Sequence, residues 1–143
     1  MALCVVDASV VAKWFLEEEF STEARRLRDD YAADLIDVAA PCLLPYEVLN
    51  APRFANVFST EELRRIAEAL DRFAIPLHLL EGALSEATLD IATSRGLTVY
   101  DASYAALARH LASPLYSADD ELIRAIRDVA EVRHIIDYST PEG

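Results

Sequence analysis

Short apolar runs alternate along the chain with longer segments whose apolar residues recur at helical spacing. Residues 3–6 are apolar, mostly β-preferring and end at Asp7, which predicts a buried strand. Residues 10–16 are apolar apart from Lys13 and predict a nearly buried helix, and residues 22–33 predict a polar one. Residues 36–40 then predict a second strand, which closes at Pro41.

The middle of the chain is rich in helix signals. A helix is expected from Leu43, with Pro45 tolerated in its first turn, and Pro52 is expected to kink or break it. Ser59 and Glu62 have the spacing of a capping box, and the apolar residues that follow keep helical spacing as far as residue 73. This predicts a second helix directly after the first.

The second half of the chain continues the alternation. Strands are predicted at residues 75–80, 97–100, 114–117 and 132–136, and helices at residues 81–94, 102–111 and 119–127, with Gly96 as a helix stop. Strands that alternate with helices are typical of a mainly parallel sheet covered by helices on both faces. We therefore expect an α/β protein, a three-layer α/β/α fold made by one domain over residues 1–143.

Composition narrows the class of protein. The 143 residues are 53% hydrophobic, which is enough to bury a core, and no apolar run approaches the roughly 18 residues of a membrane span. The apolar stretch before Asp7 is too short for a signal peptide, and Cys4 and Cys42 form no Cys-x-x-Cys pair. These features predict a cytoplasmic protein. A net charge of −12 argues against a general nucleic-acid coat.

Carboxylates recur at the junctions between predicted strands and helices. Asp7, Asp101 and Asp119 each stand at such a junction, where an aspartate is a favoured helix cap. Each junction also offers a serine that can cap instead: Ser9, Ser103 and Ser117. Glu47 lies inside a predicted helix, where it cannot cap, and Asn50 shares its face.

Parallel strands bring their carboxyl ends to one edge of a sheet, so Asp7, Asp101 and Asp119 are expected to converge there, with Glu47 added by a neighbouring helix. Like charges in one cleft repel and raise some of the pKa values unless a cation joins them. Oxygen ligands suit Mg²⁺ or Mn²⁺. A metal-bound water that attacks a phosphodiester is the chemistry that such a site supports.

Four segments of the chain resemble the PIN domain nucleases, and more narrowly the VapC-type toxin ribonucleases of toxin-antitoxin pairs. Order and spacing agree together in VVDASV (5–10), LPYEVLN (44–50), GLTVYDASYAALA (96–108) and LYSAD (115–119). The resemblance departs from the family pattern at Ser117, where a threonine is usual, and at Pro52, where the helix usually continues. It covers essentially the whole chain.

The resemblance implies an endoribonuclease that depends on Mg²⁺ or Mn²⁺. Its catalytic and metal-binding residues are Asp7, Glu47, Asp101 and Asp119, with Ser9, Asn50 and Ser117 as supporting polar groups. Asp120, next to Asp119, is a second candidate for the last of these carboxylates, but the spacing from Ser117 favours Asp119. The resemblance also implies an RNA substrate, a homodimer, and a small VapB-type antitoxin as the partner protein.

Three other protein families require residues that this chain lacks. A haloacid-dehalogenase-type phosphatase needs an aspartate where Ser9 stands, a receiver domain needs a late lysine, and a Rossmann unit needs a glycine-rich turn; the chain has none of these. Tyr46, Tyr100 and Tyr104 are interpreted as core or cleft packing before base stacking. The remaining alternative is a catalytically silent PIN-fold module that binds a protein or RNA without cleaving it.

Overall fold

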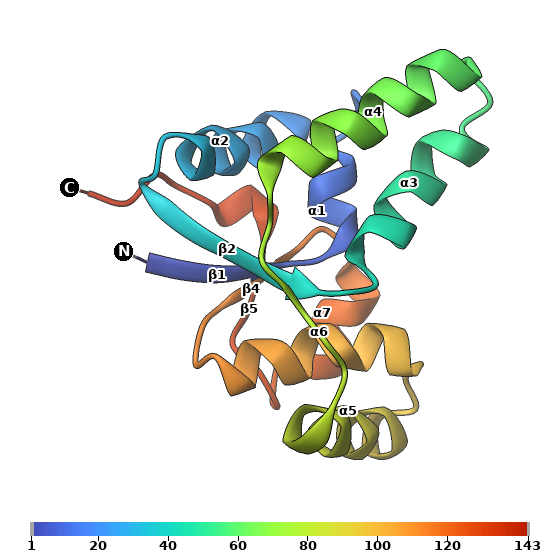
Figure 1. The fold of residues 1–143 in the computed structure, drawn as a ribbon. Helices are drawn as coiled ribbons and strands as arrows, with labels where there is room; N and C mark the ends of the chain where they lie inside the picture. The colour runs from blue at the N-terminus through green and yellow to red at the C-terminus, as the bar shows by residue number, and fades with distance from the viewer. Residues whose placement is uncertain (1, 143) are drawn as a thin grey trace.

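Five parallel strands form the central sheet of the computed structural model, which describes residues 2–142 (Figure 1). The strand order is β3-β2-β1-β4-β5, and every pair of neighbours is parallel. The strands are β1 (Ala2–Val6), β2 (Ile36–Pro41), β3 (Leu77–His78), β4 (Leu115–Ser117) and β5 (Val132–His134). The predicted α/β class with a parallel sheet is confirmed.

Helices cover both faces of the sheet. In the view of Figure 1, α1, α2 and α4 lie above the sheet and α5 and α6 lie below it, which confirms the predicted three layers. The helices within residues 2–142 are α1 (Ala8–Ala12), α2 (Ser21–Ala32), α3 (Leu44–Phe54), α4 (Thr60–Phe73), α5 (Gly82–Arg95), α6 (Val99–His110), α7 (Asp120–Ile126) and the 3₁₀ helix η1 (Ile135–Asp137). None of them is long and apolar enough to cross a membrane.

The hydrophobic core centres on β1 and the helices that sandwich it. Val5 and Val6 are fully buried, as are Val10 and Val11 of α1 on one face. The other face is covered by the alanine-rich α6, whose residues 102–108 are all buried. A central strand between two layers of helix must be apolar on both faces, which is why its sequence reads as a continuous apolar run.

Two local helix signals are confirmed by their hydrogen bonds. Ser59 and Glu62 form the reciprocal capping box at the start of α4. Gly96 ends α5 with φ of 64°, the left-handed conformation that suits a glycine.

The strand predicted at residues 97–100 is wrong, because Val99 and Tyr100 already belong to α6. Thr98 is the N-cap of this helix and accepts a hydrogen bond from the Asp101 backbone N–H at 3.1 Å. Asp101 therefore lies in the first helical turn and not at a strand end. The hydroxyl cap decided the boundary, although residues 97–100 are apolar enough for a strand.

Of the kink or break expected at Pro52, the break does not occur, since α3 continues through it to Phe54. Pro52 is buried and lies only two residues before the end of the helix. Near a helix end a proline removes a single hydrogen bond, and burial of its ring offsets that loss. The strands predicted at residues 75–80 and 132–136 are shorter than expected, because only Leu77–His78 and Val132–His134 pair with a neighbouring strand.

Candidate acidic active site

Asp7 lies directly after β1, the central strand of the sheet. β1 pairs with β2 on one side and with β4 on the other. The strand order runs outward from β1 in both directions, so Asp7 lies at the topological switch point of the sheet. Ligands of open parallel sheets bind outside the carboxyl ends of the strands at this point. The side chain is nevertheless only 4% exposed.

Three donors hold the Asp7 carboxylate. Its Oδ1 accepts hydrogen bonds from the Ser9 hydroxyl and from the Val10 backbone N–H, and its Oδ2 accepts one from the Ser117 hydroxyl. Asp7 is thus itself the N-cap of α1, a role for which the sequence offered both Asp7 and Ser9. Asp7 is therefore both a helix cap and a candidate site residue.

Ser9 and Ser117 connect Asp7 to the segment that follows β4. The Ser9 hydroxyl accepts from the Ala118 backbone N–H at 2.9 Å while donating to Asp7. The Ser117 hydroxyl accepts from the Asp119 backbone N–H at 3.0 Å while donating to Asp7, and Ser117 is fully buried. The two hydroxyls therefore hold the β4–α7 junction against β1.

Asp119 and Asp120 point in different directions from the start of α7. Asp119 is the N-cap, and its Oδ1 accepts from the backbone N–H groups of Glu121 and Leu122 at 3.0 and 3.2 Å. Asp120 lies 3.8 Å from the His134 ring nitrogen. Asp119, and not Asp120, is the carboxylate whose charge acts on Asp7 and Asp101.

Glu47 reaches the same region from α3. Its Oε1 accepts a hydrogen bond from the Tyr104 hydroxyl at 2.7 Å. Tyr104 belongs to α6 and is 2% exposed, so a buried phenol from one helix meets a half-buried carboxylate from another. Sequence analysis missed this role for Tyr104, although its position three residues after Asp101 places both on one face of a helix.

The charges of these residues form a connected set. Burial is the main cause that raises the pKa of Asp7 to about 6, and the charge of Asp119 adds to it. Burial and Asp101 raise the pKa of Glu47, while burial and Asp119 raise the pKa of Asp101. Among residues 2–142, none of the four carboxylates forms an ion pair with a lysine, arginine or histidine.

The four carboxylates lie in one region, but they are not close enough to one another to form a complete set of metal ligands. Within residues 2–142, no three side chains of His, Cys, Asp or Glu come close enough together to hold a metal ion by themselves. What the structure provides is a set of carboxylates whose charges act on one another: Asp119 on Asp7 and on Asp101, and Asp101 on Glu47.

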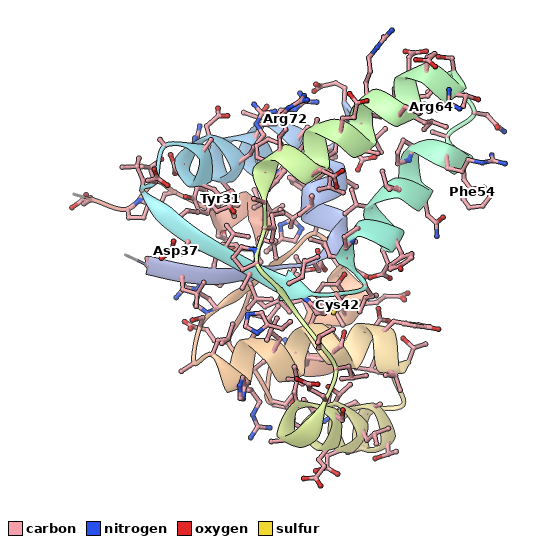
Figure 2. The ribbon with its side chains drawn as sticks, viewed as in Figure 1. Tyr31, Asp37, Cys42, Phe54, Arg64 and Arg72 are labelled. Carbon is pink, nitrogen blue, oxygen red and sulfur yellow. The ribbon has the colours of Figure 1, made fainter. Side chains whose placement is uncertain are left out.

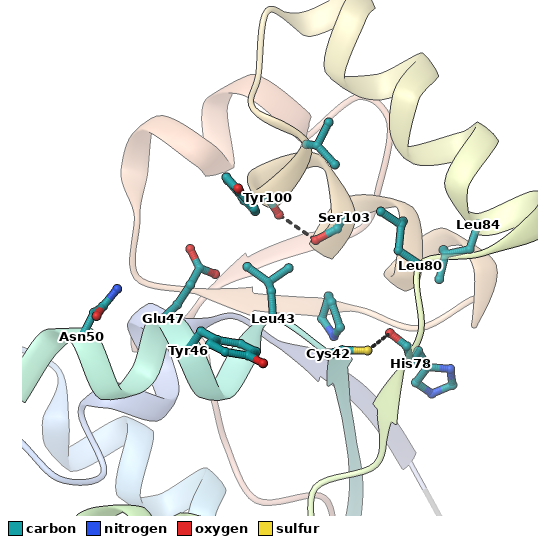
Figure 3. A pocket seen from close by; sticks show the side chains of 12 residues that line it. Cys42, Leu43, Tyr46, Glu47, Asn50, His78, Leu80, Leu84, Tyr100 and Ser103 are labelled. Carbon is teal, nitrogen blue, oxygen red and sulfur yellow. Dashed lines mark hydrogen bonds between the residues drawn. The ribbon is translucent and has the colours of Figure 1, made fainter. Parts of the chain in front are cut away.

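A cavity of about 650 Å³ opens beside Glu47 (Figure 3). Glu47 and Asn50 project from the same face of α3 into this region, as their spacing predicted, and Tyr100 lies across from Glu47. Tyr46 and Tyr100 are 77% and 64% exposed, so they belong to the wall of the cleft and not to the core. The rest of the lining is largely apolar.

Arg25, Arg64 and Arg72 do not line this cleft. Arg64 and Arg72 both belong to α4: Arg64 projects from its outer end, and Arg72 lies near α2 (Figure 2). Arg64 pairs with Glu61 at 2.7 Å, and Arg25 pairs with Glu17. These two arginines are thus part of solvated helix faces.

Comparison with known proteins agrees with this architecture. The family described as PIN domain matches residues 4–128. Ribonuclease VapC3 of Pyrobaculum aerophilum is 33% identical over 126 residues, which cover 82% of this chain and 90% of that protein.

Two solved structures are similar in fold. The crystal structure of PAE2754 from Pyrobaculum aerophilum has a TM-score of 0.60 and 26% identity, and covers 92% of this chain and 90% of that one. The toxin-antitoxin complex from Klebsiella pneumoniae has a TM-score of 0.67 and 15% identity, and the match covers 94% of this chain and 98% of that one.

Proposed function

Since the chain belongs to the PIN domain family, we propose that it is an endoribonuclease that depends on Mg²⁺ or Mn²⁺ and is the toxin of a toxin-antitoxin pair. The observation that carries the proposal is the acidic cluster in which Asp7 and Asp119 follow the carboxyl ends of β1 and β4, while Glu47 and Asp101 come from α3 and α6. Asp7 is buried, and Glu47 and Asp101 are half-buried, without a cation paired to any of them among residues 2–142. Such placement raises the pKa of each carboxyl and costs stability, so a stable fold that retains these carboxylates does so for a reason outside the fold.

The chemistry of the donor set fits a hard divalent cation. All four groups offer oxygen, and Mg²⁺ usually keeps several waters and uses one or two carboxylates directly. A site without a three-residue contact cluster is compatible with that habit, because waters bridge from the ion to the remaining carboxylates. When bound, such an ion supplies an activated water and stabilises the charge that develops on a phosphodiester.

The protein residues have distinct tasks in this proposal. Asp7 and Asp119 form the rigid side of the site, because backbone N–H groups and the hydroxyls of Ser9 and Ser117 hold them. Glu47 and Asp101 form the other side and come from different helices. Asn50, exposed and on the face of Glu47, is placed to donate to a phosphate oxygen of the substrate.

A small VapB-type antitoxin is the partner that we propose, and a homodimer is the proposed assembly. The relative is named a VapC ribonuclease, and one structural neighbour is a toxin-antitoxin complex. A net charge of −12 favours a partner with a basic segment.

RNA cleavage by the protein freed of any antitoxin tests the proposal. A fluorescent single-stranded RNA is incubated with Mg²⁺ or Mn²⁺, with chelator, and with the variants Asp7→Asn and Asp101→Asn. Cleavage is expected with either metal and is expected to fall at least a hundredfold in chelator and in both variants. Asp90→Asn, an exposed carboxylate of α5, is the matched control.

The outcomes separate the proposal from the silent binding module. Cleavage that persists in chelator, or that both aspartate variants retain, contradicts a metal-dependent carboxylate site. RNA binding without cleavage under every metal condition favours the silent module.

A further inference from the structure

Glu47 is the least constrained of the carboxylates that accept a hydrogen bond at this site. Asp7 accepts from three donors and Asp119 from two backbone N–H groups. Within residues 2–142, Glu47 accepts from one side-chain donor, the Tyr104 hydroxyl at 2.7 Å, and pairs with no cation. A glutamate also has more rotatable bonds than an aspartate, so without that donor its carboxylate samples several positions.

We propose that Tyr104 is a positioning residue, which holds the Glu47 carboxylate beside Asp101 and thereby prepares the acidic site for a divalent cation. The inference rests on the proposed function, because it assigns a role within the same site. Tyr104 donates to Oε1 and leaves Oε2 without a protein donor among the described residues, so one oxygen is held and the other is available.

Tyr104 is itself rigid, which is what a positioning residue needs. Its ring is 2% exposed, and α6 packs against both β1 and β2. It lies one helical turn after Asp101, so the same helix supplies one carboxylate and orients another. Burial, the hydrogen bond to Glu47 and the charges of Glu47, Asp7 and Asp101 all raise the pKa of Tyr104.

The competing explanation is that Glu47 merely satisfies a buried phenol. Buried tyrosine hydroxyls usually find a partner, and such pairing stabilises the fold without serving a site. The chain contains a matched pair of that kind: the Tyr138 hydroxyl donates to Asp30 Oδ2 at 2.6 Å, and Tyr138 is 5% exposed. Tyr138 lies beside the start of β1 and Pro114, at the opposite end of the strands from Asp7.

Tyr104→Phe and Tyr138→Phe therefore form a matched comparison, since each removes one hydroxyl and keeps the ring. Mn²⁺ binding to the isolated protein, followed by calorimetry or electron paramagnetic resonance without RNA, is the first readout. Tyr104→Phe is expected to weaken Mn²⁺ binding roughly 10-fold to 100-fold, the usual cost of losing a group that orients a metal ligand. Tyr138→Phe is expected to bind Mn²⁺ as the wild type does.

RNA cleavage gives the second readout. In Tyr104→Phe, the Mn²⁺ concentration for half-maximal cleavage is expected to rise by the same factor, while saturating Mn²⁺ restores kcat to within a few-fold of wild type. If Tyr104 acts through Glu47, adding Tyr104→Phe to Glu47→Ala causes no further loss, because coupled residues are not additive.

Three results overturn the inference. The first is that Tyr104→Phe binds Mn²⁺ as tightly as the wild type. The second is that Tyr138→Phe loses as much Mn²⁺ affinity as Tyr104→Phe when both lower the melting temperature equally. The third is that the losses of Tyr104→Phe and Glu47→Ala add up in the double variant. Failure of the wild type to bind Mn²⁺ or to cleave RNA counts instead against the proposed function, so the two failures are distinguishable.

Discussion

Replacing Asp7 by asparagine is expected to stabilise the metal-free protein at neutral pH. Asp7 is buried beside Asp119, and its pKa is raised from an ordinary value of 3.8 to about 6, mainly by burial. Between these two values the folded protein holds a proton that the unfolded chain has released. The free energy of unfolding therefore falls as pH rises through this range, and the whole cost is present above about pH 6.

The size of this cost follows from the two pKa values. At about 1.36 kcal/mol for each pKa unit, the difference corresponds to about 3 kcal/mol at pH 7.5. At pH 5 the same linkage leaves about half of it. Asparagine removes the charge but turns one acceptor into a donor toward Ser9 or Ser117, which costs about 1 kcal/mol for a lost hydrogen bond. A net gain of about 2 kcal/mol at pH 7.5 is expected.

Urea unfolding in chelator measures this gain. The single tryptophan, Trp14, is 4% exposed and reports unfolding by its fluorescence. The advantage of Asp7→Asn over wild type is expected to shrink by about 1.5 kcal/mol between pH 7.5 and pH 5. Asp90→Asn, which changes an exposed carboxylate, is expected to stay within about 0.5 kcal/mol at both values.

One pattern refutes the reasoning. If Asp7→Asn is less stable than wild type at pH 7.5, and the difference does not change at pH 5, the three hydrogen bonds to Asp7 outweigh its burial and the pKa is not raised.

Three further predictions concern the same region. Addition of Mg²⁺ or Mn²⁺ is expected to raise the melting temperature of the wild type and to leave that of Asp7→Asn unchanged; a flat titration with the wild type contradicts a shared cation site. Ser117→Ala removes a fully buried hydroxyl that donates to a carboxylate, and is expected to lower the free energy of unfolding by about 1.5–3 kcal/mol, measured by urea titration; a change below 0.5 kcal/mol argues against that bond. Burial raises the pKa of the Cys4 thiol to about 12, so iodoacetamide at pH 8 is expected to label the half-buried Cys42 and to label Cys4 only after denaturation; equal labelling rates in mass spectrometry contradict this.

The sequence predicted several local features of the structure correctly. The capping box of Ser59 and Glu62 and the stop at Gly96 depend on residues a few positions apart, and both are present as predicted. The apolar run before Asp7 predicted a central strand, because a strand between two helix layers has no polar face.

Local patterns misled where two short-range preferences compete. Residues 97–100 have strand composition, yet the Thr98 cap starts α6 one residue later. Pro52 is a helix breaker by preference, yet its burial near the end of α3 lets the helix continue. In both cases a tertiary or capping interaction decided between two permitted conformations.

The composition of the candidate site follows from the sequence, but its connections do not. Motif spacing named Asp7, Glu47, Asp101 and Asp119. Only the folded structure shows that the hydroxyls of Ser9 and Ser117 donate hydrogen bonds to Asp7. It also shows that Asp120 lies near His134 and that Tyr104 donates to Glu47.

The reason is one of range. Hydrogen bonds within a helix turn or a cap join neighbours in the chain, and their partners can be read from spacing. The bond from Tyr104 to Glu47 spans 57 residues and that from Ser117 to Asp7 spans 110, so packing of α3, α6 and β4 around β1 had to bring the partners together.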